Sequence, residues 1–338
     1  MFSRTRRHIA LGSALIAAAL TISACGGSTG TADTSSPAAA APVSSGAASP
    51  AAAVVEFNLT PEQNRVTTAK VDKIAAEVPQ AIRDRGTLLV TGTAGTAPPL
   101  GFYATDDTTI IGSEIDFANL IASVLGLQVQ YSAADWAQNF VRIDSSEADA
   151  FISNVTVTEE RKEKYDFATY RLDTLALETQ KDTDWTVNSR KDLAGRIIAV
   201  GSGTNQEKIL VDWNEQNVAE GLDPVDIKYF QNSTDYYLAL ASGRIDAYFG
   251  PNPTAQYHVA SSGATKVIGT FSGAGDALQG EIAVLSKKDS GLNQAFVDAL
   301  NHTIENGTYQ KVLDRWNLAS EAVTTSEANP PGLPKAAG

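Results

Sequence analysis

A run of small polar side chains that ends in an arginine lies between residues 149 and 167 and has the chemistry of an anion-binding site. The apolar residues 150–152 predict a buried strand, and Asn154 and Thr156 place an amide and a hydroxyl group where that strand ends. Arg161 follows, and its guanidinium can donate two parallel charge-assisted hydrogen bonds to one carboxylate. Together these groups predict a site for a small carboxylate.

The residues around Arg161 also allow a simpler interpretation. Thr158 can cap a helix that begins at Glu159, and the unpaired N–H groups of a helix start favour an anion. On such a helix, however, Arg161 could instead pair with a neighbouring glutamate or aspartate on a face open to solvent. The spacing alone leaves both possibilities open.

The composition is that of a folded protein long enough for two domains. The chain has 338 residues, of which 43% are hydrophobic and 19% are charged. A formal net charge of -13 and a pI near 4.7 argue against nucleic acid as a partner, because nucleic-acid-binding domains usually carry a basic surface. His258 and His302 fall on predicted helices without a paired acid, and the sequence has no phosphate-binding glycine loop and no cluster of metal ligands. We therefore predict no catalytic residues, no metal and no cofactor.

Cys25 is the only cysteine, which excludes an internal disulfide and a cluster of thiolate ligands. It follows a basic start and an apolar run over residues 9–22, and residues 22–25, with the sequence ISAC, resemble the lipobox of bacterial lipoproteins. That resemblance implies a signal peptide over residues 1–25, a lipid on Cys25 and a protein anchored to the extracellular face of the bacterial cytoplasmic membrane. The alternative is a secretory signal peptide with an incidental cysteine, and residues 5–7 are also similar to a twin-arginine export signal.

Both ends of the chain have compositions that differ from the middle. Residues 26–55 are almost entirely Gly, Ser, Thr, Ala and Pro, which predicts a disordered tether. Residues 56–77 predict an N-terminal helix extension, because Thr60 begins a capping box with a proline at the first helical position. Residues 319–338 contain several prolines and predict a disordered tail.

Between these ends, short β-rich runs alternate with helical periods, which predicts an α/β fold. The alternation restarts after Leu193, and this repeat predicts two similar lobes with a ligand-binding cleft between them. An Asp-Ala pair stands at the entry of a strand in each half, and we interpret Asp149 and Asp246 as structural residues that cap a turn. The predicted strands cover residues 87–91, 129–131, 150–152, 196–200, 227–229 and 246–249, and the predicted helices cover residues 114–124, 140–146, 206–214 and 234–241.

Several short motifs occur in a fixed order along the body of the chain. They are GTLLV at 86–90 with APPL at 97–100, GSEIDFA at 112–118, TEER at 158–161 with DF at 166–167, GTNQE at 203–207, and NGTYQKVL at 306–313 with Trp316. With these motifs, residues 78–318 resemble the extracellular solute-binding proteins of polar amino-acid ABC importers, the family 3 type. The resemblance implies a two-lobe fold of the periplasmic-binding-protein type II, in which each lobe is a mixed sheet flanked by helices and two strands form the hinge. Residues 78–174 and 281–318 would form the first lobe, and residues 175–280 the second.

The resemblance also implies which residues bind the ligand. Arg161 would grip a carboxylate, Trp136 would pack a ring against the ligand, and backbone N–H groups at a helix start of the second lobe would close over the carboxylate end. The residues implied by position are Arg161, Asn154, Thr156 and Trp136 in the first lobe and Thr204, Asn205 and Gln206 in the second.

The chain departs from the family pattern where the family binds the α-ammonium of its ligand. Pro251 stands where the family usually has an aspartate, and a proline offers neither a charge nor an N–H group. The usual acidic and aromatic positions of the first lobe fall on Ala94 and Ala97. An unpaired buried ammonium is costly, so Asn252, the hydroxyl of Tyr248 or a bound water would have to accept from an amine. We therefore expect an anionic ligand that need not be a standard α-amino acid.

The sequence thus predicts a membrane-anchored solute-binding protein that captures a small polar carboxylate-bearing solute by closure of two lobes. Its partners would be the permease and the ATPase of an ABC importer, and the protein would act as a monomer that binds no nucleic acid. One alternative is an enzyme on the same fold, resembling the cyclohexadienyl dehydratases, in which a pocket acid with a raised pKa assists elimination. A lipoprotein that presents its bound ligand to a sensor kinase is another.

Overall fold

The computed structural model describes residues 56–94 and 98–335. Cys25 and the rest of the predicted signal peptide, the tether over residues 26–55 and Ala97 lie outside these ranges. Within the described ranges, no helix combines the length and the apolar character that crossing a membrane requires.

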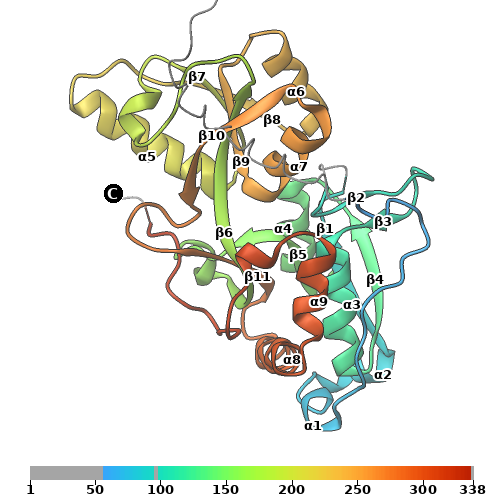
Figure 1. The fold of residues 1–338 in the computed structure, drawn as a ribbon. Helices are drawn as coiled ribbons and strands as arrows, with labels where there is room; N and C mark the ends of the chain where they lie inside the picture. Colours follow the sequence, from blue (N-terminus) through green and yellow to red (C-terminus); the bar gives the residue numbers. More distant parts are fainter. Residues whose placement is uncertain (1–55, 95–97, 336–338) are drawn as a thin grey trace, which may run out of the picture. The chain divides into compact units, whose positions relative to one another are not determined.

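The first group of elements surrounds a mixed sheet in the strand order β4-β1-β5-β11-β6 (Figure 1). The elements are α1 (Asp72–Ala75), α2 (Gln80–Arg85), β1 (Thr87–Gly92), β2 (Phe102–Tyr103), β3 (Ile110–Ile111), α3 (Ser113–Leu125), β4 (Gln128–Ala133), α4 (Trp136–Asp144), β5 (Ala150–Thr156), η1 (Arg161–Glu163), β6 (Tyr165–Gln180), β11 (Gly280–Lys287), α8 (Asn293–Glu305), α9 (Thr308–Arg315) and η3 (Ala319–Glu321). Strand β1 is parallel to β4 and β5, whereas β11 is antiparallel to β5 and β6. Leu88, Phe117 and Phe296 are fully buried in the main apolar core of this group.

The second group surrounds another mixed sheet, in the order β8-β7-β9-β6, with β10 also paired to β6. Its elements are η2 (Arg190–Leu193), β7 (Ile197–Gly201), α5 (Asn205–Ala219), β8 (Asp226–Phe230), α6 (Ser233–Ala241), β9 (Ala247–Pro251), α7 (Asn252–Ser262) and β10 (Thr265–Ser272). Leu177, Ile198 and Phe249 are fully buried in its core. The predicted α/β alternation is therefore confirmed, and strands β7, β8 and β9 are each followed directly by a helix.

Strand β6 takes part in both sheets. Its residues 165–173 pair with β11, and its residues 174–180 pair with β10. The chain returns from the second group to the first between β10 and β11, so two chain segments cross from one core to the other, and Figure 1 shows β6 running through both groups. We keep residues 174/175 and 280/281 as the proposed boundaries, and we call the two groups the first lobe and the second lobe.

Asp149 and Asp246 have the structural role that the sequence predicts. One oxygen atom, Oδ2 of Asp149, accepts a hydrogen bond from the backbone N–H of Leu89 at 2.8 Å, and Asp149 also forms an ion pair with Arg85. In the second lobe, Oδ2 of Asp246 accepts from the backbone N–H of Ile197, also at 2.8 Å. Each carboxylate therefore joins the entry of one strand to the parallel strand beside it.

The predicted helix over residues 56–77 is wrong for most of its length, because only Asp72–Ala75 is helical. Val66 and Val71 instead pack as part of an irregular segment against the first core. The backbone N–H of Val71 donates to the carbonyl oxygen of Val124 at 2.9 Å, so this segment finds its hydrogen-bond partners outside itself. Its β-branched residues are also poor helix formers.

The predicted disorder of the C-terminal tail is wrong for the described residues 319–335. We call residues 322–335 the C-terminal strap, because they run alongside β6 and the loop that follows β5. The backbone N–H of Asn329 donates to the carbonyl oxygen of Phe167 at 3.0 Å, and Lys162 Nζ donates to the carbonyl oxygen of Pro330 at 2.9 Å. The prolines disfavour a helix, but they are compatible with an extended segment that pairs with other parts of the chain.

Leu333 connects the C-terminal strap to both lobes. Its backbone N–H donates to the carbonyl oxygen of Val157 at 3.0 Å, and its carbonyl oxygen accepts from the N–H of Glu159 at 2.9 Å. Its side chain is only 4% exposed and belongs to the apolar core of the second lobe. The strap therefore makes backbone contacts to the first lobe and a side-chain contact to the second.

We expect Leu333→Ala to lower the free energy of unfolding by roughly 3 kcal/mol, because it removes a buried side chain and leaves a cavity. Leu238→Ala is the matched control, since Leu238 is 59% exposed and its truncation should change stability by less than about 0.5 kcal/mol. Urea denaturation followed by circular dichroism measures both. Equal midpoints for the two variants would show that the strap does not contribute to the folded core.

Candidate functional site

A cavity of about 140 Å³ lies between the two lobes and is lined by side chains from both. Its walls are polar and aromatic. The predicted ligand-binding residues that line it are Trp136 and Asn154 from the first lobe and Thr204, Asn205, Gln206 and Tyr248 from the second. Motifs that are far apart in the sequence are therefore brought together at one place.

The other three predicted residues lie elsewhere. Arg161 lines a neighbouring hollow that shares the start of helix α5 with the cavity. Thr156 is 1% exposed, and its hydroxyl donates to Oδ2 of Asp173 at 2.7 Å. Asn252 is the first residue of α7 and lines a separate hollow. In this structure these residues surround the cavity without forming its wall.

The guanidinium of Arg161 packs against two neighbouring aromatic rings at the contact between the lobes. Its Cζ lies 5.4 Å from the ring centroid of Trp136 and 5.4 Å from that of Phe140. Nη1 donates to the carbonyl oxygen of Thr156 at 3.0 Å, and Nη2 donates to that of Gly203 at 3.1 Å. Burial lowers the pKa of Arg161 to about 10, so the side chain stays cationic at neutral pH. Among the described residues it forms no ion pair.

The carbonyl oxygen of Gly203 accepts hydrogen bonds from two side chains of the first lobe. Trp136 Nε1 donates to it at 3.1 Å, in addition to the bond from Arg161. Gly203 has a φ of 74°, a left-handed conformation that glycine adopts at little cost. The carbonyl oxygen of Gly203, in the second lobe, thus lies where two donors of the first lobe converge.

The loop that carries Arg161 forms less helix than the sequence predicts. Thr158 does act as a cap, because its Oγ1 accepts from the backbone N–H of Arg161 at 3.1 Å. Only Arg161–Glu163 is helical, however, as a short 3₁₀ turn. Strand β6 begins at Tyr165, only two residues after this turn ends, so the segment has no room for a longer helix.

Three helices of the second lobe begin at the cavity. Strands β7, β8 and β9 are parallel neighbours, and helices α5, α6 and α7 follow them directly. The side chains of Thr204 and Asn232 cap α5 and α6 by accepting from the N–H groups of Glu207 and Asp235, at 3.1 Å and 2.9 Å. The cavity therefore lies at the carboxyl ends of these strands, where helix N-termini bring partial positive charge.

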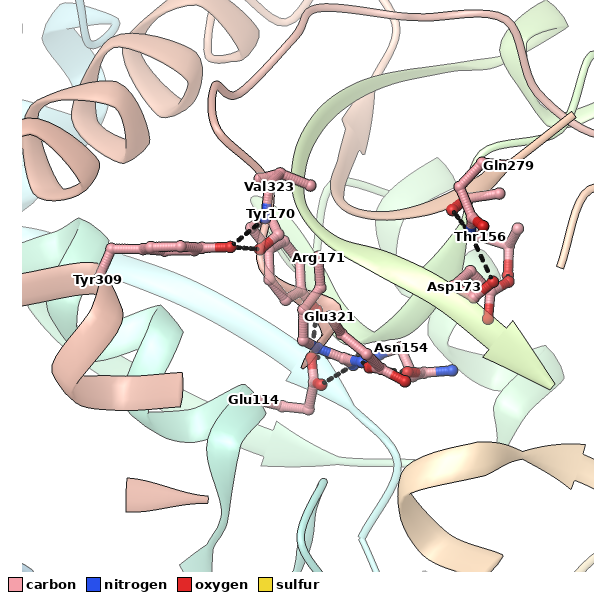
Figure 2. Close-up of polar contacts among 11 residues, drawn as sticks. Glu114, Asn154, Thr156, Tyr170, Arg171, Asp173, Gln279, Tyr309, Glu321 and Val323 are labelled. Carbon is pink, nitrogen blue, oxygen red and sulfur yellow. Dashed lines mark hydrogen bonds and ion pairs between the residues drawn. The ribbon is translucent and has the colours of Figure 1, made fainter. Parts of the chain in front are cut away.

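A buried cluster of charged side chains, which does not line the cavity, hydrogen-bonds to Asn154 (Figure 2). Arg171 Nη2 donates to Oδ1 of Asn154 at 2.6 Å and to Glu114 at 3.0 Å, and Nη1 pairs with the carboxylate of Glu321. The hydroxyl of Tyr170 donates to the other oxygen of Glu114. Asn154 itself has a φ of 54°, so its backbone conformation depends on this support. The cluster could not be found from the sequence, because its members are far apart along the chain and share no motif.

Asp173 is the acid that connects the two sides of the cavity. It is 1% exposed, and its Oδ2 accepts from the Thr156 hydroxyl at 2.7 Å and from Nδ2 of Asn205 at 3.0 Å. Burial raises the pKa of Asp173, which the hydrogen bonds from Thr156 and Asn205 oppose. It does not line the cavity, and in the described part of the chain neither do any other aspartate or glutamate side chains.

His258 has a paired acid, contrary to the sequence prediction. Its Nδ1 lies 2.5 Å from Oε1 of Glu178, which is fully buried and also accepts from the hydroxyl of Thr265. The pair was missed because 80 positions separate the two residues. Neither residue lines the cavity, and the described residues contain no cluster of three or more groups that could hold a metal ion.

The chain is similar to known proteins over most of its length. The family model for bacterial extracellular solute-binding proteins, family 3, matches residues 89–319. The L-cystine-binding protein TcyJ of Escherichia coli (strain K12) is 32% identical over 236 residues, which cover 70% of this chain and 84% of TcyJ.

Solved structures show the same similarity. An ancestral arginine-binding protein bound to arginine has a TM-score of 0.61 and 29% identity, and the match covers 69% of this chain and 98% of that protein. The ancestral amino-acid-binding protein AncCDT-1, a precursor of cyclohexadienyl dehydratase, has a TM-score of 0.60 and 25% identity over 70% of this chain and 97% of that one. The predicted two-lobe α/β fold is confirmed by these matches.

The cluster around Arg171 predicts a pH-dependent stability. Burial raises the pKa of Glu321 from its ordinary value of 4.5 to about 7, although Arg171 opposes the shift. Because the folded state binds this proton more tightly, the contribution to stability is complete below pH 4.5 and is lost as the pH rises through 7. In Glu321→Gln, we expect the fall in melting temperature between about pH 5 and pH 8 to be smaller than in the wild type.

Scanning calorimetry at a series of pH values measures this difference. Glu305→Gln is the control, because the side chain of Glu305 is exposed at the end of α8 and this variant should keep the wild-type profile. If Glu321→Gln showed the same pH profile as the control, Glu321 would not be the titrating group.

Proposed function

Because the chain belongs to the bacterial extracellular solute-binding proteins of family 3, we propose that it binds an amino acid or a similar carboxylate-bearing solute between its lobes. The observation that carries this proposal is the cationic side chain of Arg161, which lies at the contact between the lobes and has no ion-pair partner among the described residues. The names of the relatives support the class of solute, since TcyJ is named for L-cystine and the ancestral protein was solved with arginine.

We propose that a carboxylate oxygen of the solute takes the position of the Gly203 carbonyl oxygen. That position already has two donors, Trp136 Nε1 and Arg161 Nη2, each at 3.1 Å. A carboxylate would replace this neutral acceptor with a charged one, so the bond from the neutral indole N–H would become charge-assisted, and the bond from the guanidinium, which is already charge-assisted through its donor, would become an ion pair. Glycine at 203 allows the peptide to turn away, because it can adopt several backbone conformations at low cost.

Binding would proceed by closure of the lobes. Besides the bonds to Gly203, the bond between Asp173 and Asn205 joins β6, at the proposed hinge, to the start of α5 in the second lobe. A solute held by Trp136 and Asn154 on one side and by Thr204 on the other would stabilise the closed arrangement over an open one.

The setting of the protein is proposed from its family and its N-terminal sequence. A lipid on Cys25 would anchor it to the extracellular face of the cytoplasmic membrane, and the monomer would deliver its solute to the permease and ATPase of an ABC importer. The enzyme alternative receives no support from the cavity, because the acid with a raised pKa, Asp173, is turned to Thr156 and Asn205. No observation favours the sensor-kinase alternative, which would use the same site.

We expect Arg161→Ala to weaken solute binding by at least about 100-fold, because it removes a charge-assisted contact to the carboxylate. Arg161→Lys should also weaken binding, by about 10-fold, since an ammonium lacks the fixed fork with which Nη1 donates to the Thr156 carbonyl while Nη2 donates to the solute. Isothermal titration calorimetry with the twenty standard amino acids and L-cystine measures the affinities, and native mass spectrometry of the purified protein identifies any solute that it retains.

Arg244→Ala is the matched control for the loss of an arginine. Arg244 is exposed in the second lobe, where its Nε donates only to the Ser242 hydroxyl, so binding should be unchanged. Wild-type affinity in Arg161→Ala would refute the proposed role of Arg161 in binding the carboxylate.

A further inference from the structure

Two segments of the chain, one before and one after the two lobes, contact both lobes, and we propose that they hold the lobes closed and thereby raise the affinity for the solute. One is the C-terminal strap. The other consists of residues 56–71, which we call the N-terminal arm. Both lie outside residues 89–319, which the family model matches. Only the gain in affinity rests on the proposed function, because the bias toward closure exists without a solute.

The N-terminal arm is fixed to the first lobe at two places. The carbonyl oxygen of Leu59 accepts from the backbone N–H of Thr105 at 2.9 Å. Further along the arm, Arg65 forms an ion pair with Asp116 of α3, whose side chain is almost fully buried, and Arg65 Nε lies 3.2 Å from Asp116 Oδ1. A buried carboxylate is costly without a charged partner, so the arm should stay on the first lobe when the lobes move.

The ring of Phe57, near the start of the arm, contacts both lobes. Its centroid lies 5.4 Å from that of Tyr257 in α7 of the second lobe, and the two rings are stacked. It also lies 5.3 Å from the ring of Trp316 in the first lobe. Trp316 is 1% exposed and donates from Nε1 to Asp116 at 2.9 Å, so it is held by the same carboxylate as the arm. Phe57 thus joins α7 to the first lobe through aromatic contacts.

The C-terminal strap makes the same kind of connection with an aliphatic side chain. The backbone of Leu333 is hydrogen-bonded to Val157 and Glu159 of the first lobe, and the N–H of Gly332 donates to Oε1 of Glu159 at 2.9 Å. The side chain of Leu333 is buried in the core of the second lobe and lines the same hollow as Val211 of α5. The strap is therefore fixed to one lobe and packs a side chain into the other.

These contacts belong to the closed arrangement, in which Arg161 and Trp136 of the first lobe donate to Gly203 of the second. If the lobes opened, either the two apolar side chains would leave the second lobe or the two segments would leave the first. The first change exposes apolar surface and the second breaks hydrogen bonds, and both are unfavourable. Contacts made in only one arrangement shift the equilibrium toward it, and affinity rises with the population of the binding-competent arrangement.

Double electron–electron resonance tests the arrangement of the lobes without a solute. Val141→Cys in the first lobe and Leu238→Cys in the second carry the spin labels, because both positions are exposed, and Cys25→Ser removes the natural cysteine from the full chain. We expect one dominant distance when the rest of the chain is unchanged. Leu333→Ala and Phe57→Ala should each add a second distance, and that distance should be the major one when both are combined.

Three further variants separate closure from stability. Leu300→Ala removes a fully buried side chain from the core of the first lobe, so it should destabilise the fold and still keep the single distance. Leu333→Met keeps a similar apolar volume and Phe57→Tyr keeps the ring, so both should retain the original distance. A role of Leu333 and Phe57 in stability alone would not produce this pattern.

Calorimetry with the twenty standard amino acids and L-cystine measures the effect on affinity. Leu333→Ala and Phe57→Ala should each weaken binding about 10-fold, although neither residue lines the cavity. Leu300→Ala should stay within about 3-fold of the wild type.

The proposal is overturned if the double variant keeps the single distance, or if Leu300→Ala adds the second distance to the same extent. Unchanged or tighter binding of an amino acid by the double variant would overturn it as well. If no amino acid binds to the wild-type protein but the double variant shows the second distance, the proposed function fails while the bias toward closure stands.

Discussion

The buried cation of Arg171 fixes the arrangement of the first lobe. Arg171 belongs to β6, and its guanidinium pairs with Glu114 from α3 and with Glu321 from η3; all three side chains are almost fully buried. Charges removed from water are stable only when they are paired and hydrogen-bonded, so these three elements must keep their relative positions. Asn154 is part of the same network, and the position of a cavity wall therefore depends on charges that no solute touches.

The same strand carries this constraint to the second lobe. Two residues after Arg171, the carboxylate of Asp173 accepts from Thr156 and from Asn205 at the start of α5. The backbone carbonyl oxygen of Asp173 accepts from Gln279, which lies in the second crossing segment between β10 and β11, and Figure 2 shows this contact beside the one to Thr156. Packed and hydrogen-bonded groups of this kind have few alternative arrangements, so a change in lobe position must be accommodated after residue 173 rather than within the Arg171 cluster.

The parts of the fold that depend on local patterns could be predicted from the sequence. Strand β1 and helix α3 have strong apolar periodicity. Strand β1 ends one residue later than predicted, and helix α3 extends one residue further than predicted at each end. The C-terminal strap could not be predicted, because its backbone partners, such as Phe167, are far away in the sequence and exist only once the lobe has formed. The pair of Arg171 and Glu321, 150 positions apart, was missed for the same reason.

The candidate site shows the same division between local and long-range information. Gln206 could be placed at the cavity because its motif resembles that of a family, whereas Thr254 also lines the cavity but belongs to none of the family motifs. Arg161 was predicted to bind a carboxylate, but its bond to Gly203 across the lobes depends on tertiary structure.

The bond between Arg161 and Gly203 also affects how a solute would bind. The carbonyl oxygen of Gly203 already accepts from both donors. A solute that replaces it would therefore stabilise closure only by the difference in hydrogen-bond free energy between its own acceptor and this carbonyl. In the proposed binding mode, a carboxylate would gain more hydrogen-bond energy over the Gly203 carbonyl than an amide would, so selectivity for the anionic end would follow from competition with the protein's own backbone.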